Sequence, residues 1–197
     1  PGLQYDSAIQ KWHTCPASGR IHASNPCSEF LFLDDTACNL ASLNLLSFLK
    51  PDFTFDAAAF RRDAGTLFRA MDAIVDKSVY PTPRVAEMSR IFRPLGLGYA
   101  NLGAMLMALG LPYDSVEGRG WAAAITALMT GEAYRVSAEI AAKKGPFEGY
   151  EVNRDHVLQV LGLHRAAVEG INGAPPALLA PARAVWEKTL ATARDHG

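Results

Sequence analysis

The five residues Asn25-Pro26-Cys27-Ser28-Glu29 carry the densest chemistry of the chain and decide how its fold is interpreted. In an extended segment, residues two apart point to the same side. The side chains of Asn25, Cys27 and Glu29 are therefore expected to face one pocket, and the two residues between them to face away. Such a pocket presents an amide, a thiol and a carboxylate to a single substrate.

The residue types leave several kinds of chemistry open. A carboxylate can take a proton from a hydroxyl, an amide can hold a neighbouring hydroxyl, and a sulfur can act as a nucleophile or carry a hydrogen atom. A nucleophilic cysteine needs a histidine or another cation beside it to lower its pKa, and nothing in the sequence fixes His13 or His22 against Cys27. A carboxylate two residues away raises a thiol pKa instead. The pattern therefore favours a neutral thiol or a thiyl radical.

Two alternatives from other functional classes stay open. In the first, Cys27 is the nucleophile of a thiol hydrolase or transferase. In the second, the chain is a non-catalytic helical interaction module, in which Cys27 is a small residue packed in a turn.

The composition limits the partners of the chain. Its 197 residues are 49% hydrophobic, and 19 Lys and Arg against 20 Asp and Glu give a net charge of -1. This removes the positive field of a nucleic-acid binder, and the apolar stretches fall short of the roughly 20 clean residues of a membrane span. The opening at Pro1 lacks a leader and is typical of mid-domain sequence, so we expect a fragment.

The three cysteines are Cys15, Cys27 and Cys38. An odd number spread over a long chain is a poor disulfide framework and indicates a reducing compartment, the cytoplasm. Their spacing lacks the paired ligands of a structural zinc site, so we expect no bound metal. Cys15 is expected to be a packed thiol, because free cysteine is commonly buried.

We take residues 1–197 as one partial domain with two regions of different composition. Residues 1–50 are loop-like and hold the chemistry, and residues 51–197 are helix-rich. Thr54 or Asp56 is the expected cap of the first long helix, and Asp114 with Glu117 resembles a capping box. His156 and His164 are expected to face solvent or cap helix ends. The expected elements are helices at 54–78, 84–91, 100–109, 114–144, 153–161 and 176–193, and a buried strand at 93–99.

Gly96 and Gly98 lie where this strand would turn into a helix. A dinucleotide-binding loop needs a third small residue at position 101, which is Asn101. We therefore interpret the two glycines as residues that let a strand and a helix pack closely.

Seven longer blocks of the sequence carry a resemblance to known proteins. They are Trp12-His13-Thr14-Cys15-Pro16, Gly19-Arg20-Ile21, the Asn25 to Glu29 stretch, Leu33 to Leu45, Arg93 to Gly103, Ala127 to Arg135 and Gly145-Pro146-Phe147. Together they resemble one enzyme family, the adenosylcobalamin-dependent (class II) ribonucleotide reductases. The cysteine-centred block is highly specific, and the 11-residue step from Cys27 to Cys38 resembles the cobalamin-dependent class more than the iron-dependent one. His22 departs from the asparagine expected at its position.

The resemblance implies roles for individual residues. Cys27 would carry the thiyl radical, Glu29 would act as base at the substrate 3'-hydroxyl, and Asn25 would hydrogen-bond the ribose hydroxyls. Cys38 would be one of two redox cysteines, with its partner upstream of this chain. Ser24 and His22 are candidates for the substrate pocket.

The resemblance also implies a fold, a cofactor and partners. The fold would be part of a ten-stranded α/β barrel with a central finger loop, and the cofactor adenosylcobalamin. The substrate would be a ribonucleoside diphosphate or triphosphate, reduced to a deoxyribonucleotide for DNA synthesis with electrons from a thioredoxin-type reductant. The family pattern allows a homodimer of the full-length protein. We expect the isolated chain to be inactive.

Overall fold

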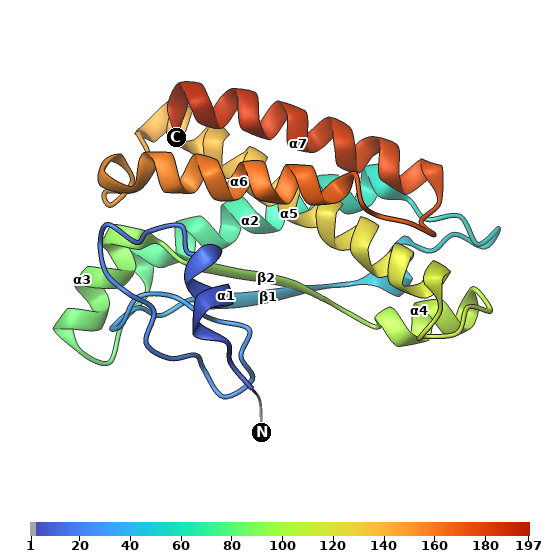
Figure 1. Cartoon of the computed structure of the whole chain (residues 1–197), viewed down its shortest axis with the longest axis horizontal. Coiled ribbons are helices and arrows are strands. Elements are labelled where there is room, and N and C mark those ends of the chain that lie inside the picture. Colours follow the sequence, from blue (N-terminus) through green and yellow to red (C-terminus); the bar gives the residue numbers. More distant parts are fainter. Residues whose placement is uncertain (1–2) are drawn as a thin grey trace.

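The computed structural model describes residues 3–197 and places two parallel strands beneath a layer of long helices (Figure 1). Strand β1 is Asn39–Asn44 and strand β2 is Leu95–Ala100. Parallel strands need a long crossover connection, and here helices α2 (Ala57–Lys77) and α3 (Pro83–Phe92) supply it. The described residues thus form a mixed α/β, helix-rich structure whose small sheet is not closed. Pro1, on which the expectation of a fragment rests, lies outside the described residues.

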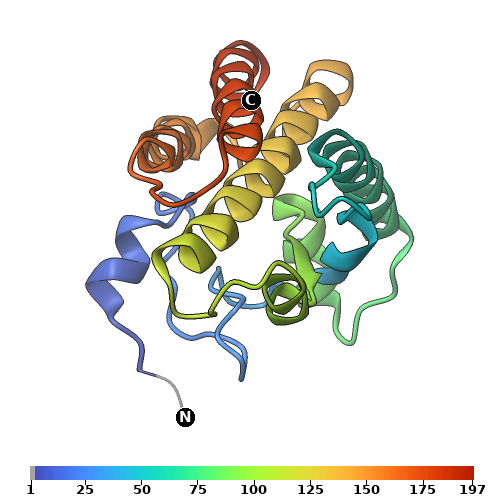
Figure 2. The same cartoon turned by 90° about the vertical axis from the view of Figure 1, so that its right-hand side faces the viewer.

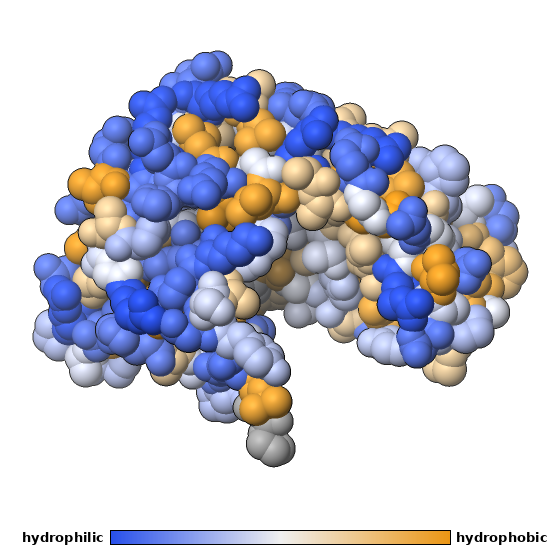
Figure 3. All heavy atoms as spheres, viewed as in Figure 1, coloured by the Kyte–Doolittle hydropathy of each residue, from blue (hydrophilic) through white to orange (hydrophobic). Residues whose placement is uncertain are grey.

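The two faces of the sheet have different surroundings. Leu43 and Leu97 belong to the face that packs on the main hydrophobic core, where the Nδ2 of Asn39 also donates to the carbonyl of Met71 in α2 at 2.9 Å. On the opposite face of β1, Leu40 is 66% exposed. Figure 3 shows a hollow in the surface between the N-terminal segment and the end that carries α4. Parallel sheets are normally covered on both faces, so one face of this sheet is open.

The glycines of β2 lie on this open face, which corrects their interpretation. Gly96 pairs with Leu40 and Gly98 pairs with Ser42, and paired residues of neighbouring strands point to the same side. A Cβ atom added at Gly96 would meet Leu40, Cys38 and Asn39, and no helix. The glycines therefore do not serve strand–helix packing.

Helix α5 (Val116–Lys144) is the centre of the helical layer, with α2, α6 and α7 against it (Figure 2). The Nε1 of Trp186 in α7 donates to the carbonyl of Ala127 in α5 at 2.9 Å. Gly131 allows this close packing, because an added Cβ would lie 2.6 Å from Val185 Cγ1. Since neighbours cover several sides of α5, its buried surface is wider than a single apolar stripe.

An ionic cluster joins α2 to α5. Glu132 is 4% exposed and accepts hydrogen bonds from Arg61 (Nη2 to Oε2, 2.9 Å) and from Arg135 (Nε to Oε1, 3.0 Å). Burial opposes the ionisation of Glu132, but the hydrogen bonds from Arg135 and Arg61 outweigh burial and hold its pKa below the usual range.

Most of the expected helices are confirmed, with shifts at their ends. Of the two candidate caps of α2, the structure uses Asp56, whose side chain accepts from the Ala59 N–H at 2.9 Å. The expected capping box before α5 is wrong: Ser115 Oγ accepts from the Gly118 N–H at 2.8 Å, and Asp114 pairs with Arg119. The remaining elements are α1 (Asp6–Lys11), η1 (Leu45–Phe48), α4 (Leu102–Ala108), η2 (Glu151–Asn153), α6 (Arg154–Val168) and α7 (Pro176–His196). None of the helices described is long and apolar enough to cross a membrane.

Candidate functional site

The stretch around Cys27 is a tight turn rather than an extended segment. Ser24 and Leu31 form an isolated antiparallel bridge, and the Ser28 N–H donates to the Asn25 carbonyl at 3.0 Å. Ser28 has φ of 64°, in the left-handed region that side chains rarely adopt. The expectation that Asn25, Cys27 and Glu29 project to one side of an extended strand is therefore wrong.

Asn25 closes this turn. Its backbone N–H donates to the Phe30 carbonyl at 3.3 Å, and its Oδ1 accepts from the Phe30 N–H at 3.0 Å. Asn25 itself is half-buried, whereas Cys27 and Glu29 are exposed. Within residues 3–197, the Nδ2 group of Asn25 has no hydrogen-bond partner, so this group is available to a substrate oxygen.

Ser24 and His22 support the loop from its flank. Ser24 Oγ donates to the Asn25 carbonyl at 2.9 Å. His22 Nδ1 lies 2.7 Å from Asp34 Oδ2, and both of these side chains are largely exposed. His22 is therefore paired with a carboxylate and not with the Cys27 sulfur.

Cys38 directly precedes β1 and is half-buried. Burial raises the pKa of its thiol, and the negative charge of Glu29 raises it further. Glu29 and Cys38 are thus the two predicted site residues that the structure brings within electrostatic reach of each other. The sulfur of Cys38 is held in its neutral, protonated form at pH 7.

Cys15 is a packed thiol, as expected. It is 1% exposed and packs with Leu33 and Phe92, and burial raises its pKa to about 11. Its N–H donates to Nδ1 of the buried His13 at 3.3 Å, and Nε2 of that ring bonds the Gly19 carbonyl at 2.9 Å. All three cysteines are free thiols.

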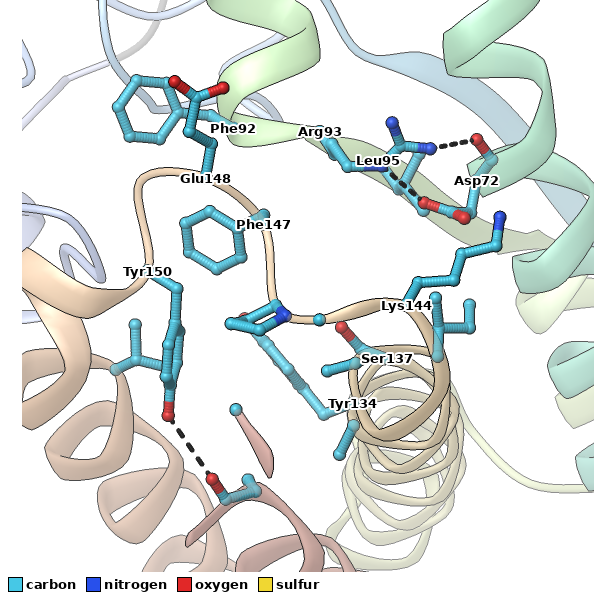
Figure 4. Close-up of a pocket in the computed structure, with 18 of the residues that line it drawn as sticks. Asp72, Phe92, Arg93, Leu95, Tyr134, Ser137, Lys144, Phe147, Glu148 and Tyr150 are labelled. Atoms are coloured by element: carbon cyan, nitrogen blue, oxygen red, sulfur yellow. Dashed lines mark hydrogen bonds and ion pairs between the residues drawn. The ribbon is translucent and has the colours of Figure 1, made fainter. Parts of the chain in front are cut away.

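Two cavities adjoin the covered face of the sheet. The larger has a volume of about 440 Å³, and Cys15, His13 and Glu29 line it, but Cys27 and Asn25 do not. The smaller, of about 280 Å³, is shown in Figure 4; Arg93 bonds Asp72 at one side and aromatic rings form the other. Its lining combines core residues with the charged side chains of Asp76, Lys144 and Glu148, which are exposed. Among residues 3–197, no group of three or more metal-ligating side chains gathers.

His164 is a residue that the sequence interpretation placed wrongly. Its ring lies between two tryptophans, with centroid distances of 4.9 Å to Trp12 and 5.7 Å to Trp186. Burial lowers the pKa of His164. The three rings come from segments far apart in the sequence, so no local pattern predicts this contact.

Comparison with known proteins places the chain in a family. The model of the ribonucleotide reductase barrel domain matches residues 1–197. The chain is 52% identical over its whole length to a vitamin B12-dependent ribonucleotide reductase of Rhodopirellula baltica, and 47% identical to one of Streptomyces coelicolor. Over 78% of its length it is 36% identical to a vitamin B12-dependent ribonucleoside-diphosphate reductase of Mycobacterium tuberculosis.

The chain covers 19%, 21% and 22% of these three relatives, about a fifth of their length. The matches span both the loop that carries Cys27 and the helices that follow it. The chain therefore belongs to the ribonucleotide reductase barrel-domain family.

Proposed function

We propose that this chain is the part of a vitamin B12-dependent ribonucleotide reductase that carries the radical cysteine, Cys27, and one redox cysteine, Cys38. The proposal is carried by the different environments of the three thiols, in a chain whose relatives are named vitamin B12-dependent ribonucleotide reductases. Cys27 is exposed on a turn, Cys38 is half-buried near the Glu29 carboxylate, and Cys15 is sealed in the core.

The residue types fit a balanced reaction. A Cys27 thiyl radical takes the hydrogen atom from C3' of the ribose, forming an S–H bond, while the Glu29 carboxylate accepts the proton of the 3'-hydroxyl. The C2'–O bond then breaks, and the oxygen takes a proton and leaves as water. Two thiols, Cys38 and a second one, supply two electrons and two protons and form a disulfide; one hydrogen ends in the water and the other on C2'. Finally Glu29 returns its proton to the 3'-oxygen and Cys27 returns a hydrogen atom to C3', which restores the thiyl radical.

The geometry of the turn supports these roles. The Nδ2 group of Asn25 can donate to a ribose hydroxyl while the Oδ1 atom holds the loop closed. The raised pKa of Cys38 keeps its hydrogen on sulfur until the substrate accepts it. Ser24 stabilises the loop through its hydrogen bond to the Asn25 carbonyl. We propose that Ser24 and His22 border the substrate pocket.

Adenosylcobalamin, when bound, supplies the radical chemistry that a protein side chain cannot begin by itself. The two cavities described above hold about 440 and 280 Å³; only the larger is of a size that suits drug-sized ligands, and neither is large enough for a corrinoid. An exposed Cys27 fits a cofactor that approaches from outside this segment. Cys27 would face that cofactor, and the turn would hold its sulfur in place.

The same proposal extends to the fold and the partners. The open face and free edges of the β1–β2 pair suit a ten-stranded barrel in which the turn around Cys27, before β1, lies on the finger loop. The substrate is a ribonucleotide, a diphosphate by the name of the Mycobacterium tuberculosis relative. The reductant is a thioredoxin-type dithiol protein, and free thiols suit a reducing cytoplasm. A homodimer is compatible with this arrangement.

The test uses the full-length protein with adenosylcobalamin, a dithiol and a ribonucleoside diphosphate. Cys27→Ser should abolish deoxyribonucleotide formation, because an oxygen–hydrogen bond is too strong for the hydrogen exchange. Cys15→Ala is the matched control and should retain activity, since that thiol is buried outside the site. Equal activity of the Cys27→Ser variant and the wild type would overturn the proposal, as would robust reduction by the isolated 197-residue chain, which is expected to be inactive.

A further inference from the structure

Gly96 lies against the Cys38 thiol. It occupies the second position of β2, paired with Leu40 of β1. A Cβ atom added at Gly96 would lie 2.3 Å from Leu40 Cδ2, 3.2 Å from Cys38 Sγ and 3.3 Å from the Asn39 carbonyl oxygen. No side chain larger than hydrogen fits there without movement of its neighbours.

Gly98 provides an internal comparison. It lies on the same strand and the same open face, two residues further along. A Cβ atom there would meet only Ser42 Oγ at 3.5 Å and the Ala41 carbonyl at 4.0 Å, which are ordinary contacts. Neither glycine has positive φ, so neither position needs glycine for its backbone conformation. Of these two glycines, only Gly96 has neighbours too close for a Cβ atom.

The three conflicts at Gly96 differ in how easily they are relieved. Leu40 is 66% exposed, so its side chain can rotate away into the open. The Asn39 carbonyl is held in the paired strands. Two conflicts remain, with that carbonyl oxygen and with the Cys38 sulfur, and of the two the half-buried side chain of Cys38 is the freer to move.

We propose that Gly96 is a positioning residue for Cys38: the bare backbone of β2 gives the thiol its place at the start of β1. This inference rests on the proposed function, in which Cys38 forms a disulfide during each turnover. A disulfide tolerates little error, since its S–S length is about 2.05 Å and its Cβ–Cβ distance lies within about 3.5–4.5 Å. A methyl group at position 96 would displace the sulfur by a few tenths of an ångström, a sizeable part of that range.

The experiment measures alkylation of Cys38 by iodoacetamide in this chain, resolved by peptide mass spectrometry. The variants are Gly96→Ala, Gly98→Ala, Leu40→Ala and the Gly96→Ala/Leu40→Ala double variant. Leu40→Ala removes the closest conflict, so the double variant keeps only the contacts with the Cys38 sulfur and the Asn39 carbonyl oxygen. Mild overpacking predicts a change of about fivefold in the alkylation rate of Cys38. We expect alkylation to be faster in both variants that carry Gly96→Ala.

The Cys27 rate should stay constant in every variant, and Gly98→Ala and Leu40→Ala should leave Cys38 unchanged. A Cys38 rate in the double variant equal to that of Leu40→Ala would overturn the proposal. So would an equal effect of Gly98→Ala, or failure of the double variant to fold, because Gly96 would then serve strand packing and not the thiol. The assay needs no turnover, so failure here is distinguishable from failure of the proposed function.

In the full-length protein, Gly96→Ala should lower kcat for reduction with little change in the KM for the nucleotide. Gly98→Ala is the control. A rise in KM with kcat unchanged would contradict the assignment, because a positioning residue for the redox thiol acts after the substrate is bound.

Discussion

Glu132 offers the sharpest stability prediction, because the charge cluster around it joins α2 to α5. Its side chain is 5% exposed and accepts from Arg61 and Arg135, whose side chains are 34% and 12% exposed. Glu132→Gln keeps the shape of the side chain but removes the charge, which leaves Arg61 without its carboxylate and Arg135 with Glu139 alone. Breaking a buried ion pair in this way costs about 3–5 kcal/mol. Because Arg61 is a third exposed, we expect the lower end, about 3 kcal/mol.

Glu139 is the matched control. It lies on the same helix and pairs with Arg69 and Arg135, but its side chain is 35% exposed. A pair open to solvent contributes about 1 kcal/mol or less. Urea unfolding of the chain at pH 7 should therefore show a much larger loss of unfolding free energy for Glu132→Gln than for Glu139→Gln.

The pH dependence of the same pair gives a second check. The pKa of Glu132 is lowered in the folded state, so its contribution is present above the unfolded pKa of about 4.3 and is lost as the pH falls through the folded pKa. The difference between wild type and Glu132→Gln should shrink in the acid range. Equal losses for the two variants at pH 7, or a difference that grows in acid, would refute the reasoning.

Two further predictions concern packing and thiol access. Gly131→Ala should lower the melting temperature, because its methyl group would lie 2.6 Å from Val185 Cγ1 in α7 and the overpacking cost of about 1–3 kcal/mol exceeds the gain in helix propensity. Gly162→Ala is the control: it has no neighbour within 4 Å and should be neutral or stabilising. The reverse order of melting temperatures would count against the α5–α7 interface. In the second prediction, alkylation at pH 8 is fastest at Cys27, slower at Cys38 and slowest at Cys15, whose pKa is about 11. Fast labelling of Cys15 would contradict its burial.

The helices could be predicted from sequence because their signals are local. Apolar residues recur at helical spacing through Phe60, Leu67, Met71, Ile74 and Val75. The structure buries Phe60, Met71 and Val75 on α2, whereas Ile74 is 51% exposed, and Asp56 caps that helix. The cap of α5 was harder to assign, because Asp114 and Ser115 are adjacent and both are good cap residues. The choice depends on how the chain enters the helix, which a local pattern does not contain.

The site could be predicted only in part. The residue types around Cys27 indicate the chemistry, and the family match agrees with the resemblance on which their roles depend. The turn at residues 25–28 depends on the two hydrogen bonds between Asn25 and Phe30, which two-residue alternation does not indicate. The proximity of Glu29 to Cys38 and the contact of Cys38 with Gly96 join segments far apart in the sequence, so only the structure shows them.

The most direct measurement follows the hydrogen at C3' of the substrate through the full-length protein with adenosylcobalamin. Reduction of a ribonucleotide that carries deuterium at C3' should be slower than reduction of the unlabelled compound, because the Cys27 sulfur must break that carbon–hydrogen bond. Equal rates for the two substrates in single-turnover experiments, where product release does not limit the rate, would contradict hydrogen transfer to Cys27.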